Sequence, residues 1–331
     1  MQNIRSGGVR MGIKILTPGM FTTVQDGGRK GYQSSGFSPA GVMDTRSYRI
    51  ANLLVDNDAD EAVLEIMMLG PSIEFGEDEV IAVTGAPVDP RINERPVSMN
   101  RALQVKRGDI LKFGYPKTGR YAYIAFAGGL DIQMVMGSRS THTKSLMGGF
   151  RGGRLEAGAL IRLRNPRKRL RRMNKRDLSD WSETYKDGAV KASSELLRVI
   201  LGPQDDYFTK EGMVTFLNAE YKVDVDSDRM GYRLSGEPVE AKQGVDILSD
   251  GIAFGAVQIT PEGQPIIMLA DRQTTGGYAK IANVISVDIP RLVQLRTNEK
   301  VKFTACSVEV GQRLYRAQQE EFERIKNERF G

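Results

Sequence analysis

The chain has 331 residues, of which 40% are hydrophobic and 27% charged, and this composition is typical of a soluble globular protein with one large or two ordinary domains. It contains one cysteine, Cys306, and one histidine, His142, so a disulfide framework and a Cys/His zinc site within the chain are both excluded. The net charge is +6, and the chain lacks an apolar run of the roughly 18 residues that cross a membrane. We therefore expect a cytoplasmic protein that binds no membrane and holds no metal by ligands of its own, with His142 on the surface.

The N-terminal residues 1–11 carry charge but no apolar segment, which predicts a flexible leader rather than a secretory signal. Both following halves, 12–164 and 195–310, are mostly β by pattern. Short runs rich in Val, Ile, Leu and Tyr, such as VIAVTG, RYAYIAF, LLRVILG and PIIMLA, recur between clusters of Gly, Asp, Asn and Pro. The sequence therefore predicts a mainly β protein with few helices and two domains at these bounds.

Three helices are expected. Residues 44–55 have apolar positions at helical spacing after Asp44, a plausible N-cap, and residues 204–217 are similar, with an acidic first turn. The third, over 311–331, is a charged C-terminal helix. LQVKRGDILKF (103–113) also aligns without gaps on VQLRTNEKVKF (293–303), which predicts one type of hairpin used twice. A duplicated domain explains this repeat, and so does the reuse of a common hairpin in unrelated barrels.

The positive charge is concentrated in one segment. Residues 162–176 hold nine Lys or Arg and no acid, so the remainder of the chain is slightly acidic. The segment contains no aromatic residue that could stack on bases, which argues against nucleic acid. We expect residues 165–194 to be a basic polar linker, solvated and open to an acidic partner.

Four polar, Gly-rich segments stand out at 23–44, 137–154, 227–236 and 271–280. Each places Arg beside Gly and hydroxyl residues, and such groups can form a site for carboxylate or phosphate. Taken singly, each segment is better explained as a hairpin loop that contains an internal Asp–Arg pair, and it is the repeated composition of the four that favours a site. A Walker A loop and a GxGxxG fingerprint are both absent from the sequence, so any nucleotide would be held in another way.

Long motifs along the chain closely resemble the biotin-dependent carboxyltransferase-like family. They are GMFTTVQDGGRKGYQSSGFSPAGVMD, LEIMMLGPSIEF, VTGA with a downstream Asn93, GSRST, LGPQDDYF, SDRMGYRLSG and SDGIAFGAVQITPEGQPIIMLADRQTTGGYAKIANVI. The resemblance covers about residues 12–310. It implies two tandem cyclophilin-like β-barrel domains and a B-type partner of similar architecture.

The family includes the C subunit of bacterial 5-oxoprolinase, the antagonist of the Kip sporulation kinase inhibitor, and the second half of the carboxyltransferase region of urea carboxylase. The resemblance therefore implies a C subunit that works with A and B subunits to open 5-oxoproline to glutamate with ATP, and that is inactive alone. It leaves open a carboxyltransferase component for a urea-like amide with a separate biotin carrier, and a regulatory protein that binds a Kip-type inhibitor. An AMKM-like biotinyl-lysine motif does not occur, so we expect no covalent biotin on this chain.

On this basis we expect the four segments to meet at one pocket for a small-molecule substrate. The cofactors expected are ATP and Mg²⁺, and either this chain or a partner subunit supplies the nucleotide contacts. The carboxylates proposed for acid–base catalysis are Asp26, Asp228 and Asp271. The residues proposed to bind substrate or phosphate are Gln25, Arg29, Ser138, Arg139, Thr141, Arg229, Arg272, Gln273, Thr274, Thr275, Gly276, Gly277 and Tyr278.

Overall fold

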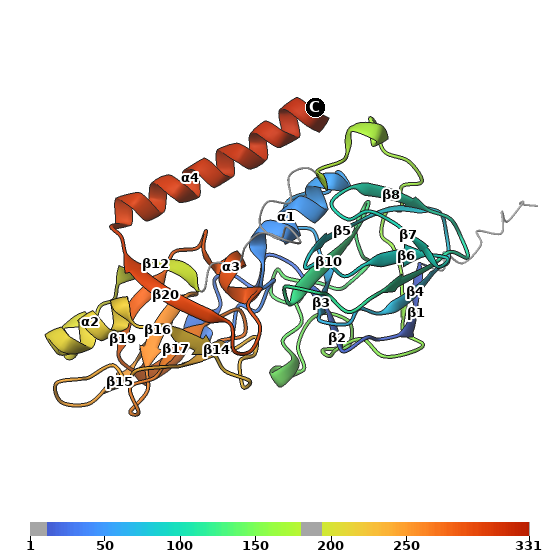
Figure 1. Cartoon of the computed structure of the whole chain (residues 1–331). Coiled ribbons are helices and arrows are strands. Elements are labelled where there is room, and N and C mark those ends of the chain that lie inside the picture. The colour runs from blue at the N-terminus through green and yellow to red at the C-terminus, as the bar shows by residue number, and fades with distance from the viewer. Residues whose placement is uncertain (1–11, 180–193, 331) are drawn as a thin grey trace, which may run out of the picture.

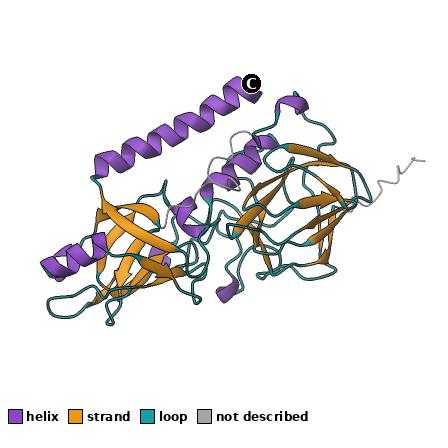
Figure 2. Cartoon of the chain, viewed as in Figure 1, coloured by secondary structure: helices purple, strands orange, loops and turns teal. Residues whose placement is uncertain are grey.

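The computed structural model describes residues 12–179 and 194–330, and its strands form two groups joined by helices and loops at the centre of the molecule (Figure 1, Figure 2). The predicted leader, 1–11, lies outside the described residues, and so does most of the C-terminal half of the predicted linker, 180–193. Within the described part, no helix combines the length and the apolar character needed to cross a membrane.

The first half consists of two antiparallel sheets around one core. One sheet contains β11 (Leu160–Ile161), β1 (Ile13–Thr17), β4 (Ser72–Phe75), β9 (Ile110–Phe113), β6 (Pro90–Ile92) and β7 (Arg95–Pro96), in that order. The other contains β2 (Phe21–Gln25), β3 (Val63–Met67), β10 (Tyr121–Phe126), β5 (Glu79–Gly85) and β8 (Ala102–Val105). Apolar side chains of both sheets, such as Ile15, Ile73 and Ile124, are fully buried between them.

The second half is a closed barrel, as predicted. Its strands follow the order β12 (Glu195–Leu201), β19 (Lys280–Val284), β16 (Ala256–Ile259), β17 (Pro265–Met268), β14 (Gly231–Ser235), β13 (Tyr221–Val223) and β20 (Lys300–Ala305). The parallel pair β12–β20 closes the ring, and a separate ribbon pairs β15 (Asp246–Gly251) with β18 (Thr275–Tyr278). The first half thus differs from the second, because its strands divide between two sheets instead of one continuous ladder.

Helices lie between and beside the two halves. α1 (Thr45–Leu54) packs on β5 and β10, and the Asp44 carboxylate caps it by accepting from the amides of Arg46 and Ser47, as the sequence predicts. α3 (Ile289–Val293) contacts α1 from the second half. α2 (Lys210–Asn218) lies against β20, where Phe216 stacks on Phe303. The helix expected over 204–217 therefore begins later than predicted, because Thr209 is its cap and the acidic residues form a separate turn, Asp205–Tyr207.

The C-terminal helix is α4 (Val308–Ile325), followed by one π-type turn, Lys326–Phe330. It leaves the second barrel after β20 and runs across the molecule to the first half (Figure 1). The remaining short turns are Gln33–Ser35, Thr143–Ser145 and Met173–Lys175.

Two predictions of local structure are wrong. The repeated phrase forms no hairpin in either place: β8 pairs with β5 and β9 with β4 and β6, so residues 103–113 cross between sheets, while residue 293 ends a helix. The described part of the basic linker is also not a free connector. Leu170 and Leu178 are buried in the apolar core that contains α1 and the second barrel. Arg176 is only 3% exposed, and its guanidinium donates to the Asp56 carboxylate and the Leu53 carbonyl.

Candidate functional site between the two halves

The first two Gly-rich segments meet at Asp26, directly after β2. Its carboxylate accepts from the Ser138 and Ser140 hydroxyls at 2.7 and 2.6 Å, from the Arg139 amide, and from the Gly28 amide at 2.9 Å. Asp26 is 4% exposed. Four donors on one buried carboxylate hold it in place and stabilise its charge, so Asp26 ties the 23–44 segment to the 137–154 segment.

The other two segments meet the first at Arg229. Its guanidinium donates to both oxygens of Asp271, at 2.9 Å each, and to the Gly41 carbonyl at 2.6 Å. It also forms an ion pair with Glu65 on β3. Glu65 in turn accepts from the Met43 amide. All four predicted segments therefore converge where the two halves meet.

The charges in this network are strongly coupled. Burial alone would lower the pKa of Arg229, but Asp271 and Glu65 outweigh burial and raise it, so Arg229 stays a cation. Burial raises the pKa of Glu65, and Arg229 opposes that shift. The network thus places one cation between two acidic side chains in a largely buried site, which suits a structural clamp.

Beside the clamp lies a cavity of about 570 Å³, which we call the central cavity. Its walls come from the 27–42 segment, the start of α1, the second barrel and α4. The polar side chains that line it are Lys30, Gln33, Thr45, Tyr48, Arg49, Asp60, Arg272, Ser286, Tyr315, Gln318 and Gln319. Three cations face one carboxylate, so the central cavity favours an anion.

Arg272 is the most unusual of these cations. It is 6% exposed and donates to the Ile252 and Leu269 carbonyls, but it forms no ion pair within the described residues. Its guanidinium lies 5.6 Å from the ring centre of Phe254, and burial lowers its pKa to about 10. A buried guanidinium without a carboxylate is costly for the free protein, so it is suited to bind an anionic ligand.

Tyr48 on α1 offers a second polar group. Its side chain is 3% exposed, and within the described residues its hydroxyl has no hydrogen-bond partner of normal geometry, although it lies near the Gly27 amide. Burial, and next the charge of Asp26, raises the pKa of Tyr48, so the hydroxyl keeps its proton and can donate it in a hydrogen bond. Among the described residues that line the cavity, Arg272 and Tyr48 are therefore the two buried groups with unused hydrogen-bonding capacity.

The structure places the predicted site residues in three groups. Arg272 alone lines the central cavity. A second group does not line the cavity but holds the adjacent loops together through hydrogen bonds and ion pairs. Its members are Gln25, Asp26, Arg29, Ser138, Arg139, Thr141, Arg229 and Asp271. A third group lies away from it: Asp228 is in an exposed turn paired with Lys144, and residues 273–278 enter the β15–β18 ribbon.

Two details of the third group explain its position. A Cβ on Gly276 would lie 2.6 Å from Ile252, so this glycine allows side-chain packing and not ligand approach. Tyr278, predicted to bind substrate or phosphate, packs instead on the apolar core that α1 shares with the second barrel. His142, expected on the surface, is 8% exposed and bonded to the Ser145 hydroxyl.

Sequence reasoning missed most of the cavity lining, including Lys30, Tyr48, Asp60 and the α4 residues. Lys30 lies inside the first Gly-rich segment, so its place in the sequence could have identified it as a candidate anion-binding residue. For metals, no group of three or more His, Cys, Asp or Glu side chains suited to hold an ion occurs in residues 12–179 and 194–330. Asp60 is the one carboxylate of the cavity that could contact a metal brought by a ligand.

Residues 35–305 match the family model described as carboxyltransferase domain, subdomain A and B. The chain belongs to this family. A protein from Escherichia coli (strain K12), named as the C subunit of 5-oxoprolinase, is 36% identical over 315 residues, which cover 95% of this chain and 97% of the relative. One of the same name from Haemophilus influenzae is 33% identical over 312 residues, with 92% and 94% covered.

Among solved structures, the urea amidolyase of Kluyveromyces lactis is 29% identical, with a TM-score of 0.86. The alignment covers 96% of this chain but 20% of that one. The carboxyltransferase-family chain described here thus corresponds to one region of that much longer protein, and to nearly the whole of the two bacterial relatives.

Proposed function

We propose that this carboxyltransferase-family chain is the C subunit of an ATP-dependent 5-oxoprolinase, which opens 5-oxoproline to L-glutamate together with A and B subunits. The observation that carries the proposal is the end-to-end similarity to two proteins named as that subunit. Names with the word subunit imply further chains, and we identify these with the A-type and B-type partners. A cytoplasmic setting suits the proposal, because the lone cysteine needs no oxidising compartment.

The proposed reaction needs an anion site. A lactam carbonyl is a weak electrophile, so the γ-phosphoryl group of ATP passes to the lactam oxygen and activates the ring carbon. Water then adds to this carbon, and the ring C–N bond breaks to free the amine and leave an acyl phosphate. A second water hydrolyses the acyl phosphate to glutamate and inorganic phosphate. Both the substrate carboxylate and the transferring phosphoryl group need cations, which Arg272, Lys30 and Arg49 supply in the central cavity.

The acid–base group is reassigned within this proposal. Asp26 and Asp271 already accept hydrogen bonds from fixed donors, and Asp228 lies outside the cavity. Asp60 lines the cavity, is exposed, and forms no ion pair in the described part of the chain. We therefore assign the proton transfer to Asp60.

Mg²⁺ belongs to the proposal through ATP. It favours one or two carboxylates together with phosphate oxygens and water over a cage made by the protein. A single cavity carboxylate, Asp60, fits that pattern. Mg²⁺ would supply charge neutralisation at the phosphates, and the residues of this chain would position the substrate.

The test is reconstitution of this chain with its neighbouring A- and B-type subunits. We expect 5-oxoproline-dependent release of ADP and glutamate that needs all three chains. Arg272→Ala should lower the rate about a hundredfold or more, as the loss of a preorganised charge does. Arg29→Ala and Arg229→Ala should lower it too, by disturbing the supports. Full activity without this chain, or unchanged rates for all three variants, would reject the proposal.

A second candidate is a carboxyltransferase component for a urea-like amide, favoured by the TM-score of 0.86 to urea amidolyase. Urea has no carboxylate for Arg272, so we rank this candidate lower. It predicts transfer of CO₂ to urea when a biotinylated carrier and bicarbonate are supplied. A regulatory role remains as the third outcome: tight binding of a Kip-type inhibitor without ATP turnover.

A further inference from the structure

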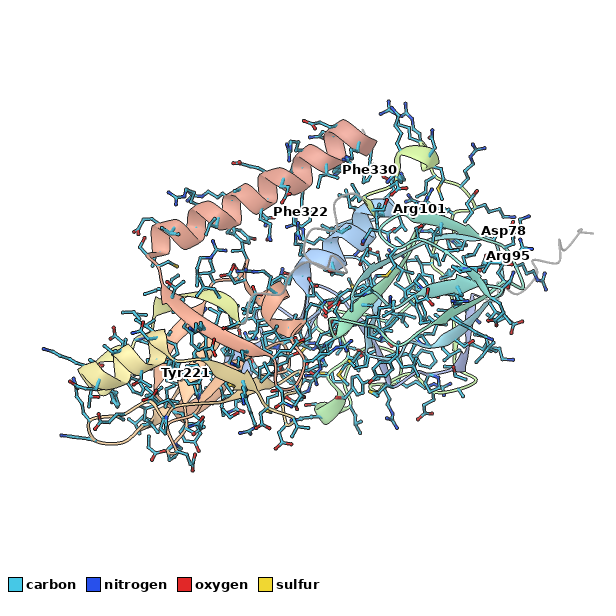
Figure 3. The ribbon with its side chains drawn as sticks, viewed as in Figure 1. Asp78, Arg95, Arg101, Tyr221, Phe322 and Phe330 are labelled. Atoms are coloured by element: carbon cyan, nitrogen blue, oxygen red, sulfur yellow. The ribbon has the colours of Figure 1, made fainter. Side chains whose placement is uncertain are left out.

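α4 connects the two halves from outside their sheets. It begins after the Ser307 cap, just beyond β20, and the family match ends at residue 305. Figure 3 labels Phe322 and Phe330 on the last turns, at the end of the helix that lies over the first half. α4 therefore lies beyond the matched residues of the family model, and part of it lines the central cavity.

The far end of α4 is firmly attached. Phe322 is 5% exposed, and the Arg49 guanidinium lies 4.1 Å from its ring centre. Arg49 also donates to the side-chain oxygen of Gln319. About two turns after Phe322, the Arg176 guanidinium lies 5.0 Å from the ring centre of Phe330. Because the helix begins next to β20 and its far end is docked on the first half, the residues between them lie over the cavity.

Those residues give the cavity a neutral polar wall. Tyr315, Gln318 and Gln319 line it from α4, and Gln319 contacts the cavity cation Arg49. Gln318 also lines a second cavity of about 470 Å³, so it lies at the boundary between this cavity and the central cavity. The oxygen of Gln319 is used by Arg49, which leaves its NH₂ group to donate elsewhere.

We propose that α4 is the selectivity element of the central cavity. Gln318 and Gln319 hydrogen-bond the neutral amide of a small ligand whose carboxylate is bound by Arg272. The identity of this ligand as a carboxylate-bearing lactam rests on the proposed function. An apolar group in the place of the amide would leave the glutamine groups unpaired, and this penalty rejects the wrong ligand.

The test is calorimetric binding to the full chain without partners or ATP, with three probes of one shape. They are 5-oxoproline, 2-pyrrolidinone, which lacks the carboxylate, and cyclopentanecarboxylate, which lacks the amide. We expect the wild-type chain to prefer 5-oxoproline over both others by at least about tenfold, the value of one good hydrogen bond.

The variants separate the two ends of the ligand. Gln318→Leu and Gln319→Leu should each weaken 5-oxoproline about tenfold and leave cyclopentanecarboxylate unchanged or tighter. Arg272→Met should weaken both carboxylates and spare 2-pyrrolidinone. Gln312→Leu, an exposed position of α4 that lines neither cavity, is the matched control and should bind as wild type.

The inference is overturned if the wild-type chain binds no lactam, or if both glutamine variants keep the wild-type preference. The proposed function fails separately. Selective binding with no glutamate release by the reconstituted complex would reject the function and keep the selectivity role. Turnover by the reconstituted complex, with a KM for 5-oxoproline that neither glutamine substitution changes, would support the proposed function and reject the selectivity role of α4.

Discussion

Arg229 of the second barrel forms a buried ion pair with Glu65 of the first half, and the exposed fractions of the two side chains are 7% and 2%. The same guanidinium holds both oxygens of Asp271. The contact joins segments 164 residues apart. A buried pair of this kind contributes little over an apolar replacement, but it makes each partner depend on the others.

Loss of the Arg229 cation should therefore be severe. Arg229→Met leaves Glu65 and Asp271 buried without a counter-charge, and we expect a loss of about 3–5 kcal/mol in the free energy of unfolding. Urea unfolding measures it. Lys300→Met removes a cation from a surface pair with Glu220 and should change little. Similar, small effects of both substitutions would show that the clamp is not a stabilising network.

The sequence predicted what local patterns determine. The cap at Asp44 follows from residue types at fixed spacing, whereas the closed second barrel was expected from the family resemblance. The convergence of the four Gly-rich segments was also anticipated, from their shared composition. The false hairpin at 103–113 shows the limit: strand–turn–strand spacing does not say which sheet each strand joins.

The cavity lining was largely beyond reach of the sequence. Gln318 and Gln319 look like ordinary solvated positions of a charged helix, and only the docking of Phe322 and Phe330 brings them over the cavity. Asp26 shows the converse. Its Gly-rich surroundings suggested catalysis, but the same surroundings supply the donors that occupy it.

Arg272 should behave differently from Arg229, although both are buried arginines. Arg272→Met removes an uncompensated charge and two hydrogen bonds to carbonyls, and these effects oppose each other. We expect unfolding stability within about 1 kcal/mol of wild type, together with loss of anion binding. Arg316→Met, on the exposed side of α4, is the control for both measurements. A collapse in stability equal to that of Arg229→Met would assign Arg272 a structural role instead.

Gly149 tests the support under the site. It has a φ of +54°, and an added Cβ would lie 1.8 Å from the Thr141 hydroxyl, which donates to the Val24 carbonyl. Gly149→Ala should cost about 2–5 kcal/mol from strain and overpacking. Gly153→Ala, with open space around its Cβ, should cost far less. Equal melting temperatures for the two variants would contradict this account of the segment.

Glu79 predicts a pH-dependent stability unrelated to the cavity. It begins β5, is fully buried, and accepts from the Val80 and Arg167 amides through one oxygen, while its other oxygen has no partner among the described residues. Burial raises its pKa from 4.5 to about 8. Between these values the folded protein keeps a proton that the unfolded chain has released, so stability falls as pH rises through this window.

Glu79→Gln replaces the titratable carboxyl group by a neutral amide of the same shape. Its stability relative to wild type should therefore increase from pH 5 to pH 8, by up to about 1.4 kcal/mol per pH unit. Urea unfolding at several pH values measures the difference, and Glu237→Gln, at an exposed turn, is the control. A constant difference between Glu79→Gln and wild type across this range would mean that Glu79 is ionised in the folded protein, with Arg167 and the two amides sufficient to hold its charge.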